Sequence, residues 1–239
     1  MIKVSIIIPA YNEEKYLPET LGRIEKAVSL IASRSEVIVV DNDSEDKTRH
    51  VAESCGAKVF RESTRNISSV RNTGAENSAG DILIFIDADT HVPDSLFQKI
   101  AAVMEDEKCY GGAAAVEYED SQRKWIKFYL YGWKFWGKFF NMKQGAAQFC
   151  RKSVFAELEG YDQSIFVGED IEFYWRLSRF ARQNGGYAYF VENPKVRTSA
   201  RRFDKMSPGK ILWFTNPIFI YLTWRNKSFW KDWYEKAVR

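Results

Sequence analysis

The stretch Ile-Leu-Ile-Phe-Ile-Asp-Ala-Asp-Thr-His at residues 82–91 decides the fold. Its five consecutive apolar residues predict a strand buried on both faces, which is typical of parallel sheets in α/β proteins. Asp87 and Asp89 follow at the carboxyl end of this strand, where open α/β sheets bind their ligands. In extended backbone the two residues point the same way, about 6–7 Å apart, and their charges repel by roughly 2–3 kcal/mol at an effective dielectric near 20. We therefore expect a hard divalent cation, Mg²⁺ or Mn²⁺, between them; the alternative is a solvated loop with two surface aspartates.

Strand-like and helix-like patterns alternate before this stretch. The run Val4–Ile8 and residues 37–40 predict two more buried strands, and residues 58–60 predict a short third one. An amphipathic helix is predicted between the first two strands, because apolar residues recur there at spacings of three and four: Leu17, Leu21, Ile24, Val28 and Ile31. Asp43 or Ser44 is expected to cap the helix after the second strand, and residues 65–80 form a polar connection. The alternation predicts an α/β fold with a doubly wound, mostly parallel sheet.

Polar residues also follow the first two strands. The first strand ends in Pro9-Ala10-Tyr11-Asn12-Glu13 and the second in Asp41-Asn42-Asp43-Ser44, so these segments and Asp87 are expected to share one crevice. No GxGxxG follows the first strand and no GxxxxGK[ST] occurs anywhere, which excludes the Rossmann dinucleotide and P-loop classes. A phosphate-containing ligand would then need a metal and basic side chains instead of a glycine-rich cradle.

The second half of the chain adds another acidic site. A helix is predicted from Gly168-Glu169-Asp170 to residue 184, with both carboxylates in its first turn. The helix dipole favours negative charge there, so we expect a lowered pKa and an ionised carboxylate that can accept a proton. Residues 125–140, which lie between Asp89 and this predicted helix in the sequence, include nine aromatic side chains. These fit either a helix packed on several sides or the wall of an acceptor groove.

Charge divides the chain unevenly. Residues 195–239 carry 11 Lys/Arg and 3 Asp/Glu, a net +8, so with the whole chain at +3 the first 194 residues carry −5. A strand is predicted at residues 187–191, and residues 196–202 are expected to form a basic loop that could cover a diphosphate. The apolar run at 211–224 would span only about 21 Å as a helix, short of the roughly 30 Å of a bilayer core. It could lie in a membrane interface, or dock on the body of the protein or on a second subunit.

Cysteine usage and the N-terminus indicate the compartment. Three widely spaced cysteines favour free thiols in a reducing environment over disulfides or structural zinc. The chain begins directly with a strand-like run and lacks the features of a signal peptide. We expect a cytoplasmic protein, at most in peripheral contact with the inner face of an anionic membrane.

Five short motifs follow one another along the chain: Pro9-Ala10-Tyr11-Asn12-Glu13, Val40-Asp41-Asn42-Asp43-Ser44, Arg71-Asn72-Thr73-Gly74, Asp87-Ala88-Asp89 and Gly168-Glu169-Asp170. Their order and spacing resemble glycosyltransferase family two. The resemblance covers roughly residues 3–180. It implies a GT-A type fold with a Rossmann-like sheet, an inverting transfer from a UDP- or GDP-sugar, and a Mg²⁺ or Mn²⁺ cofactor. It also implies a catalytic domain at 1–203, divided near 110 into nucleotide-binding and acceptor halves. A basic aromatic helical extension would follow at 204–239.

The resemblance also implies roles for individual residues. Pro9, Tyr11 and Glu13 would line the nucleotide pocket, Asp41 would accept from the base and Arg71 would help hold the nucleotide. Asp87 would approach the ribose or metal-bound water, and Asp89 would ligate the metal. Asp170 would be the general base, with Glu169 beside it orienting the acceptor. The acceptor would be a glycan or a lipid-linked hydroxyl compound; no nucleic-acid partner is expected, and the extension could mediate oligomerisation.

Two departures from the family pattern stand out. Asp-Asn-Asp-Ser replaces the usual Asp-Asp-Gly-Ser after the second strand, which leaves the nucleotide base open. Many relatives supply a late histidine as a metal ligand, but Thr198, Ser199 or Arg201 stands in that region here, so two alternatives are open: the metal is held weakly, or arginine replaces it. The QxxRW motif of processive synthases is absent, which favours single transfers.

Two rival functions remain open from the residues. Asp87-Ala88-Asp89-Thr90 also fits the motif of haloacid-dehalogenase-like phosphatases, with Asp87 as nucleophile and Asp89 as acid/base. That motif belongs on the first strand of its sheet, whereas three predicted strands precede it here. A non-catalytic carbohydrate-binding module is the other alternative, and it would tolerate the loss of Asp89.

Overall fold

A computed structural model describes residues 3–31, 34–118, 145–201 and 206–230, and the single residues 125, 129, 132, 137, 142 and 143. Its strands form one eight-stranded sheet in the order β3-β2-β1-β4-β7-β6-β8-β5. Their bounds are β1 Lys3–Ala10, β2 Arg34–Asp41, β3 Lys58–Arg61, β4 Ile82–Ile86, β5 Thr90–His91, β6 Cys109–Tyr118, β7 Ala147–Arg151 and β8 Tyr187–Thr198. The first four neighbours in the sheet, β3 to β4, run parallel, and β7 runs antiparallel between β4 and β6. The predicted mostly parallel α/β sheet is confirmed.

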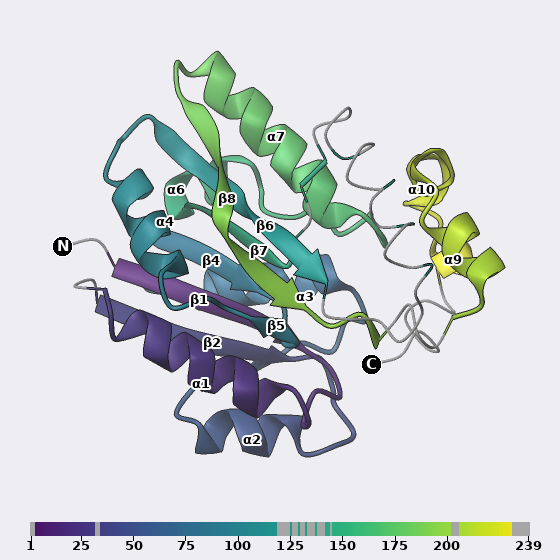
Figure 1. Ribbon diagram of the computed structural model, residues 1–239, viewed down its shortest axis with the longest axis horizontal. Coiled ribbons are helices and arrows are strands. Elements are labelled where there is room, and N and C mark those ends of the chain that lie inside the picture. Colours follow the sequence, from purple (N-terminus) through teal and green to yellow (C-terminus); the bar gives the residue numbers. More distant parts are fainter. Residues whose placement is uncertain are drawn as a thin grey trace.

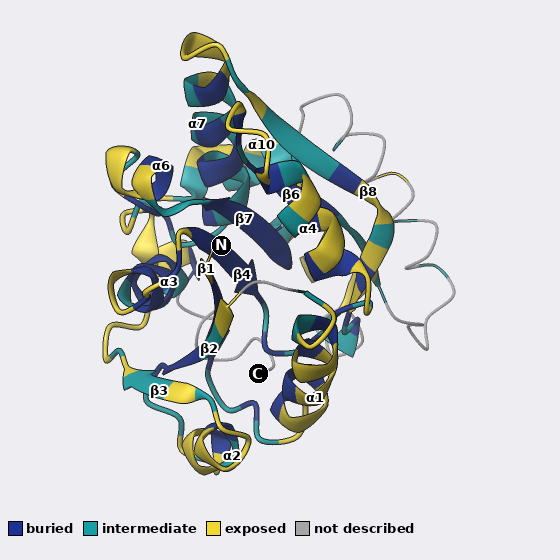
Figure 2. Cartoon of the chain, turned by 90° about the vertical axis from the view of Figure 1, so that its left-hand side faces the viewer, coloured by how far each residue is buried: buried dark blue, intermediate teal, exposed yellow. Residues whose placement is uncertain are grey.

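Helices cover both faces of this sheet (Figure 1). Their bounds are α1 Leu17–Val28, α2 Thr48–Ser54, α3 Ile67–Glu76, α4 Leu96–Met104, α6 Lys152–Glu157, α7 Glu169–Gln183, α9 Pro208–Phe214 and α10 Pro217–Thr223. Apolar residues of α1, α2 and α4 belong to one core cluster, whereas those of α3, α6 and α7 belong to another. Colouring by burial shows the central strands buried and the helices exposed on their outer sides (Figure 2).

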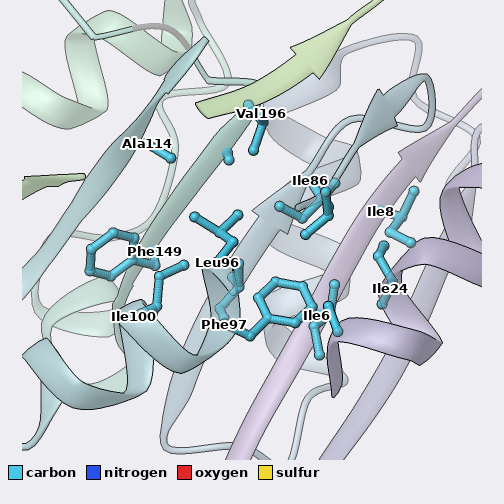
Figure 3. Close-up of a cluster of buried hydrophobic side chains, with 14 of the residues drawn as sticks. Ile6, Ile8, Ile24, Ile86, Leu96, Phe97, Ile100, Ala114, Phe149 and Val196 are labelled. Atoms are coloured by element: carbon cyan, nitrogen blue, oxygen red, sulfur yellow. The ribbon is translucent and has the colours of Figure 1, made fainter. Parts of the chain in front are cut away.

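Strand β4 lies between the two clusters. Ile82, Ile84 and Ile86 pack into the first cluster, while Leu83 and Phe85 pack into the second. Figure 3 shows the first cluster, in which Ile6 and Ile8 of β1 and Ile86 meet side chains of α1, α4 and β7. All five β4 residues are at most 2% exposed, as the apolar run predicts. Burial on both faces fixes the strand's register, and thereby the position of the carboxylates that follow it.

Three local expectations were wrong. The polar stretch after residue 65 contains α3, whose buried residues include Ser68, Ser69, Arg71 and Asn72. Neither Asp43 nor Ser44 caps α2, which begins at Thr48 with no side-chain cap; the Ser44 hydroxyl instead accepts from the Asn12 amide. Strand β8 is longer than expected, so Val196–Thr198 belongs to the sheet and not to a loop.

The apolar run near the C-terminus forms two short helices instead of one. Pro217 has no amide hydrogen to donate, and Asn216 caps α10 by accepting from the amides of Ile218 and Phe219. In the part of the chain that the structure describes, no helix is long and apolar enough to cross a membrane. Most of the aromatic stretch 125–140, expected as a packed helix or a groove wall, lies outside the described residues.

Candidate active site

A pocket opens at the carboxyl ends of β1, β2 and β4. It lies at the edge where the three strand-end motifs were expected to meet. Five of the predicted site residues line it, together with six others: Pro9, Ala10, Tyr11, Glu13, Asn42, Ile67, Val70, Asp87, Ala88, Asp89 and Arg201. The strand ends therefore bring Glu13, Asp87 and Asp89 to one surface, although they come from two segments more than seventy positions apart.

Arg201 supplies a positive charge on one side of this pocket. Its guanidinium pairs with Glu13 and lies 3.3 Å from Asp89 Oδ2, while the Thr198 hydroxyl donates to Asp89 Oδ1 at 3.3 Å. Burial works against the charged guanidinium, but Glu13 and Asp89 raise the pKa of Arg201. Two of the three residues singled out in place of the late histidine thus contact Asp89. The guanidinium acts as counter-charge to two carboxylates.

Arg71 supplies the second positive charge and joins the two halves of the site. It is 2% exposed; Nη2 donates to Asp87 Oδ1 at 3.0 Å and Nη1 to Glu169 Oε1 at 2.7 Å. Burial opposes its charge, yet Asp87, Glu169 and Asp170 together hold the pKa of Arg71 above its ordinary value. A buried arginine shared by two carboxylates stays charged and fixes both. Arg71 therefore connects the end of β4 to the start of α7.

Helix α3 fastens the segment before α7 through two more side chains. Asn66 caps α3 by accepting from Ser68 and Ser69, and its amide donates to Gln163 O at 2.8 Å. Asn72 donates to Tyr161 O and accepts from Tyr161 N, both at 2.9 Å. Together with Arg71, these contacts hold residues 161–169 against one face of α3. The sequence did not reveal them because they depend on partners about 90 or more positions away.

Asp170 lies half-buried at the start of α7. Its Oδ2 accepts from Gly145 N at 2.5 Å and its Oδ1 accepts from its neighbour Ile171 N at 2.8 Å. Burial, and then the nearby negative charge of Glu169, raise the pKa of Asp170 to about 7. The expected lowering by the helix dipole is therefore wrong, because loss of water and the adjacent carboxylate outweigh the dipole. A carboxyl group with a pKa near neutrality is suited to exchange a proton at physiological pH.

Of the residues predicted to bind the nucleotide base, Tyr11 lines this pocket, whereas Asp41 lies outside it. The Arg65 guanidinium stacks over the Tyr11 ring, 3.8 Å from its centre. Asp41, at the end of β2, is buried and accepts from Ser44 N at 3.3 Å; it faces a broad open depression that Arg65 also lines. Arg65 connects the depression to the pocket, and its cation and the Tyr11 ring can both stack on a planar heterocycle. Arg65 was not among the predicted site residues.

The acidic residues at the end of β4 fit a metal that is shared with a ligand. Among the described residues, no group of three or more His, Cys, Asp or Glu side chains could hold a metal by itself. Asp87 and Asp89 nevertheless offer two hard oxygen donors in one pocket. Mg²⁺ commonly takes one or two carboxylates and completes its shell with substrate phosphates and water. The donor set therefore fits a metal–diphosphate complex and not a closed protein cage.

Fold and site together define the class. A mostly parallel sheet whose strand ends carry carboxylates, followed by a second acidic site at α7, is the GT-A type of glycosyltransferase fold. A mannosyltransferase from Pyrobaculum calidifontis, solved with GDP-mannose and Mn²⁺, superposes with a TM-score of 0.61 at 16% identity, covering 81% of this chain and 56% of that one. This likeness shows the fold.

The chain belongs to glycosyl transferase family 2, whose sequence model matches residues 5–158. It is 39% identical over 110 residues to a 4,4'-diaponeurosporenoate glycosyltransferase of Staphylococcus haemolyticus, covering 41% of this chain and 28% of that protein. It is 34% identical over 104 residues to a dolichol-phosphate mannosyltransferase of Pyrococcus furiosus, covering 41% and 29%. The matches thus span less than a third of the length of these curated relatives. The family match sets aside the phosphatase alternative, and β4 is the fourth strand along the chain, not the first.

Proposed function

We propose that this protein transfers one sugar from a nucleotide-sugar donor to the hydroxyl group of a lipid-linked acceptor, with inversion at the anomeric carbon. The observation that carries the proposal is the arrangement around Arg71. This arginine joins Asp87 in the donor pocket to Glu169, the neighbour of a carboxyl group whose pKa lies near 7. A donor-binding edge and a proton acceptor are thereby held in one rigid unit.

The acceptor half of the reaction falls to Asp170. Its ionised carboxylate takes the proton of the acceptor hydroxyl as the oxygen forms a bond to the anomeric carbon. The bond from that carbon to the diphosphate breaks at the same time, and the nucleoside diphosphate leaves with the bonding electrons. Glu169, buried at 7% exposure and bonded to Arg71, acts by positioning this site and by setting the local charge.

The pocket at the ends of β1 and β4 would bind the nucleotide-sugar donor. Tyr11 and Arg65 would stack on the nucleotide base, Asp41 would accept from it, and Pro9 and Glu13 would shape the pocket wall. Asp89, with Asp87 beside it, would hold the Mg²⁺ or Mn²⁺, which when bound neutralises the leaving diphosphate. Arg201 lies close enough to Asp89 to meet the same diphosphate, so its guanidinium shares that task.

The relatives support a lipid-linked acceptor. The Pyrococcus furiosus protein is named for dolichol phosphate, and related proteins of Pseudomonas are named for undecaprenyl phosphate. We extend this class to the present chain because its C-terminal residues 195–239 carry a net charge of +8, and lipid-phosphate carriers are anionic. Localisation at the cytoplasmic face of a membrane belongs to the same proposal.

Calorimetry with UDP and GDP in the presence of Mn²⁺ tests the two halves separately. Asp89→Ala should weaken nucleotide binding at least about tenfold, because it removes a metal ligand. Asp170→Asn should leave that binding unchanged, yet slow sugar transfer or donor hydrolysis by about 10²–10⁴-fold.

Asp94→Ala is the matched control, since Asp94 is exposed and pairs only with Lys26 among the ion pairs of the described residues. Equal heats for wild type and Asp89→Ala would contradict the donor assignment. Full activity of Asp170→Asn would contradict the assignment of the base.

A further inference from the structure

The segment from α9 to residue 230 exposes an unusual amount of apolar surface. Of the nine large apolar side chains that are exposed in the described part of the chain, six lie in this segment. We call these six the docking face: Leu212, Trp213, Ile218, Tyr221, Leu222 and Phe229. Their exposed fractions run from 51% to 75%. Exposed apolar side chains concentrated in one short segment mark a candidate binding surface.

The docking face borders a small core of this segment, since Trp213 and Phe229 pack on Phe219 at centroid distances of 4.9 and 5.9 Å and still remain more than half exposed. The segment has a small core of its own, in which Phe214 and Phe219 pack their rings against Trp230 at centroid distances of 5.6 and 6.0 Å. Trp230 is fully buried, and its indole N–H donates to Thr223 O at 3.0 Å. On α10, Phe219 faces inward, whereas Ile218, Tyr221 and Leu222 follow the i, i+3, i+4 spacing of the opposite face. The helix is therefore apolar on both sides.

The positive charges around the docking face favour an anionic partner. Residues 206–230 contain Lys210, Arg225 and Lys227 and no Asp or Glu. Arg225 pairs with Asp162, whereas Lys210 and Lys227 are exposed and take part in no ion pair among the residues described. Apolar and aromatic side chains bordered by lysines suit the headgroup layer of an anionic bilayer. A second copy of this face would bring Lys210 and Lys227 close to the same two lysines, and residues 206–230 supply no carboxylate to offset them.

We infer that the docking face binds the surface of an anionic membrane, with α9 and α10 lying in the headgroup layer. Each helix has seven residues, about 10 Å, so neither can span the bilayer and both must lie along its surface. Tyr and Trp side chains are favoured at this depth, since each combines an apolar ring with a polar group.

Contacts with the body place this face beside the acceptor site. Phe166 N donates to Trp224 O at 2.7 Å, and the Arg225 guanidinium lies 2.8 Å from Asp162. A methyl group at Gly168 would lie 3.5 Å from Ile220 Cγ2, and Gly168 is two residues before Asp170. In Figure 1, α9 and α10 lie beyond the end of α7 that begins with Glu169. The link to a lipid-linked acceptor rests on the proposed function, whereas the binding of the face to lipid does not.

Flotation of the full chain with lipid vesicles, without donor or acceptor, tests the inference. Wild type should bind vesicles containing phosphatidylglycerol and bind pure phosphatidylcholine vesicles far less. Ile218→Ser/Leu222→Ser should weaken partitioning at least about tenfold, because each side chain loses apolar burial. Lys210→Gln/Lys227→Gln should weaken it by about tenfold or more, an effect that high salt reproduces. Leu30→Ser is the matched control, since Leu30 is 47% exposed at the end of α1, away from the docking face, and its loss should change nothing.

Several outcomes would overturn the inference. The first is that wild type fails to bind anionic vesicles, and the second is that Ile218→Ser/Leu222→Ser binds them as well as wild type does. The third is that wild type sediments as a dimer that Leu222→Ser dissociates, while neither protein binds vesicles. Calorimetry of the same variants with nucleotide separates this inference from the proposed function. Vesicle binding without nucleotide binding would sustain the docking face and contradict the transferase. Nucleotide binding without vesicle binding would support the transferase and contradict membrane binding by the docking face.

Discussion

Arg71 donates to Glu169 across 98 positions of sequence, with 2.7 Å between Nη1 and Oε1. The same guanidinium donates to Asp87, so one buried cation holds a carboxylate of the proposed donor pocket and a carboxylate beside the proposed base. Both halves of the site then depend on a single side chain of α3. This arrangement makes Arg71 a determinant of stability as well as of ligand binding, and the two effects can be measured apart.

Arg71→Met should destabilise the protein by about 3–5 kcal/mol, because Glu169 is left as a buried carboxylate without its partner. Urea unfolding followed by circular dichroism measures this loss. The double variant Arg71→Met/Glu169→Gln should recover part of it, since the uncompensated charge is gone. Arg23→Met is the control: Arg23 pairs with Glu19 on the surface, both side chains are about half exposed, and such pairs contribute at most about 1 kcal/mol. Equal losses for Arg71→Met and Arg23→Met would show that the buried pair is unimportant.

The pH dependence of activity should follow Asp170. Its raised pKa of about 7 means that the carboxyl group holds its proton in the folded protein at acidic pH. Since the proposed base must be ionised, kcat/KM should rise with pH and reach half its maximum near pH 7. Initial rates of transfer or of donor hydrolysis across pH 5–9 measure this limb. A rate that is already constant between pH 5 and 6 would rule out Asp170 as the base.

The same group should give a stability effect of predictable sign. Between about pH 4 and pH 7 the folded protein binds a proton at Asp170 that the unfolded chain has released, so stability falls as pH rises through this window. Asp170→Asn lacks this slope. The free energy of unfolding of the variant minus that of wild type should therefore increase by about 1–4 kcal/mol from pH 4 to pH 7. Asp106→Asn is the control, because hydrogen bonds from Lys108 and Tyr187 lower the pKa of Asp106, so any slope that Asp106 contributes has the opposite sign.

The sheet was predictable because its signals are local. β1, β2 and β4 are apolar runs that need no partner to be recognised, and the carboxylates that follow them meet because parallel strands end at one edge. The break between α9 and α10 also had a local signal in Pro217, which was not used. Local patterns therefore identified five of the eleven residues that line the pocket.

Two features that the sequence did not predict, helix α3 and the raised pKa of Asp170, depend on contacts between distant segments. Helix α3 lacks a strong apolar period because Ser68, Arg71 and Asn72 are among its buried residues, and the last two form hydrogen bonds with residues 161–169. The pKa of Asp170 depends on burial, which no sequence spacing encodes. Tertiary hydrogen bonding and loss of water thus overrode helix periodicity and the dipole argument.

Arg201→Ala should have opposite effects on two ligands. Asp89 and Glu13 lose their guanidinium, so Mn²⁺ alone should bind several-fold more tightly by calorimetry or electron paramagnetic resonance. The nucleoside diphosphate should bind about tenfold more weakly in the presence of saturating Mn²⁺, because a charge-assisted contact is lost. Arg197→Ala is the control, since Arg197 is exposed and lies 3.8 Å from Glu117. If both affinities are unchanged in Arg201→Ala, Arg201 has no part in donor binding.

Gly145→Ala tests whether the position of the Asp170 carboxylate is critical. A methyl group at Gly145 would lie 2.4 Å from Asp170 Cβ and 2.9 Å from Oδ2, so either the aspartate or the backbone that donates to it must shift. We expect turnover to fall about a hundredfold while nucleotide affinity stays unchanged, because small displacements of a reacting group are costly and the donor pocket is not touched. Gly22→Ala is the matched control: nothing lies within 4 Å of that position on α1, and the exchange should stabilise the helix by about 0.5–1 kcal/mol. Unchanged turnover in a folded Gly145→Ala would mean that Asp170 is not held where the proton is taken.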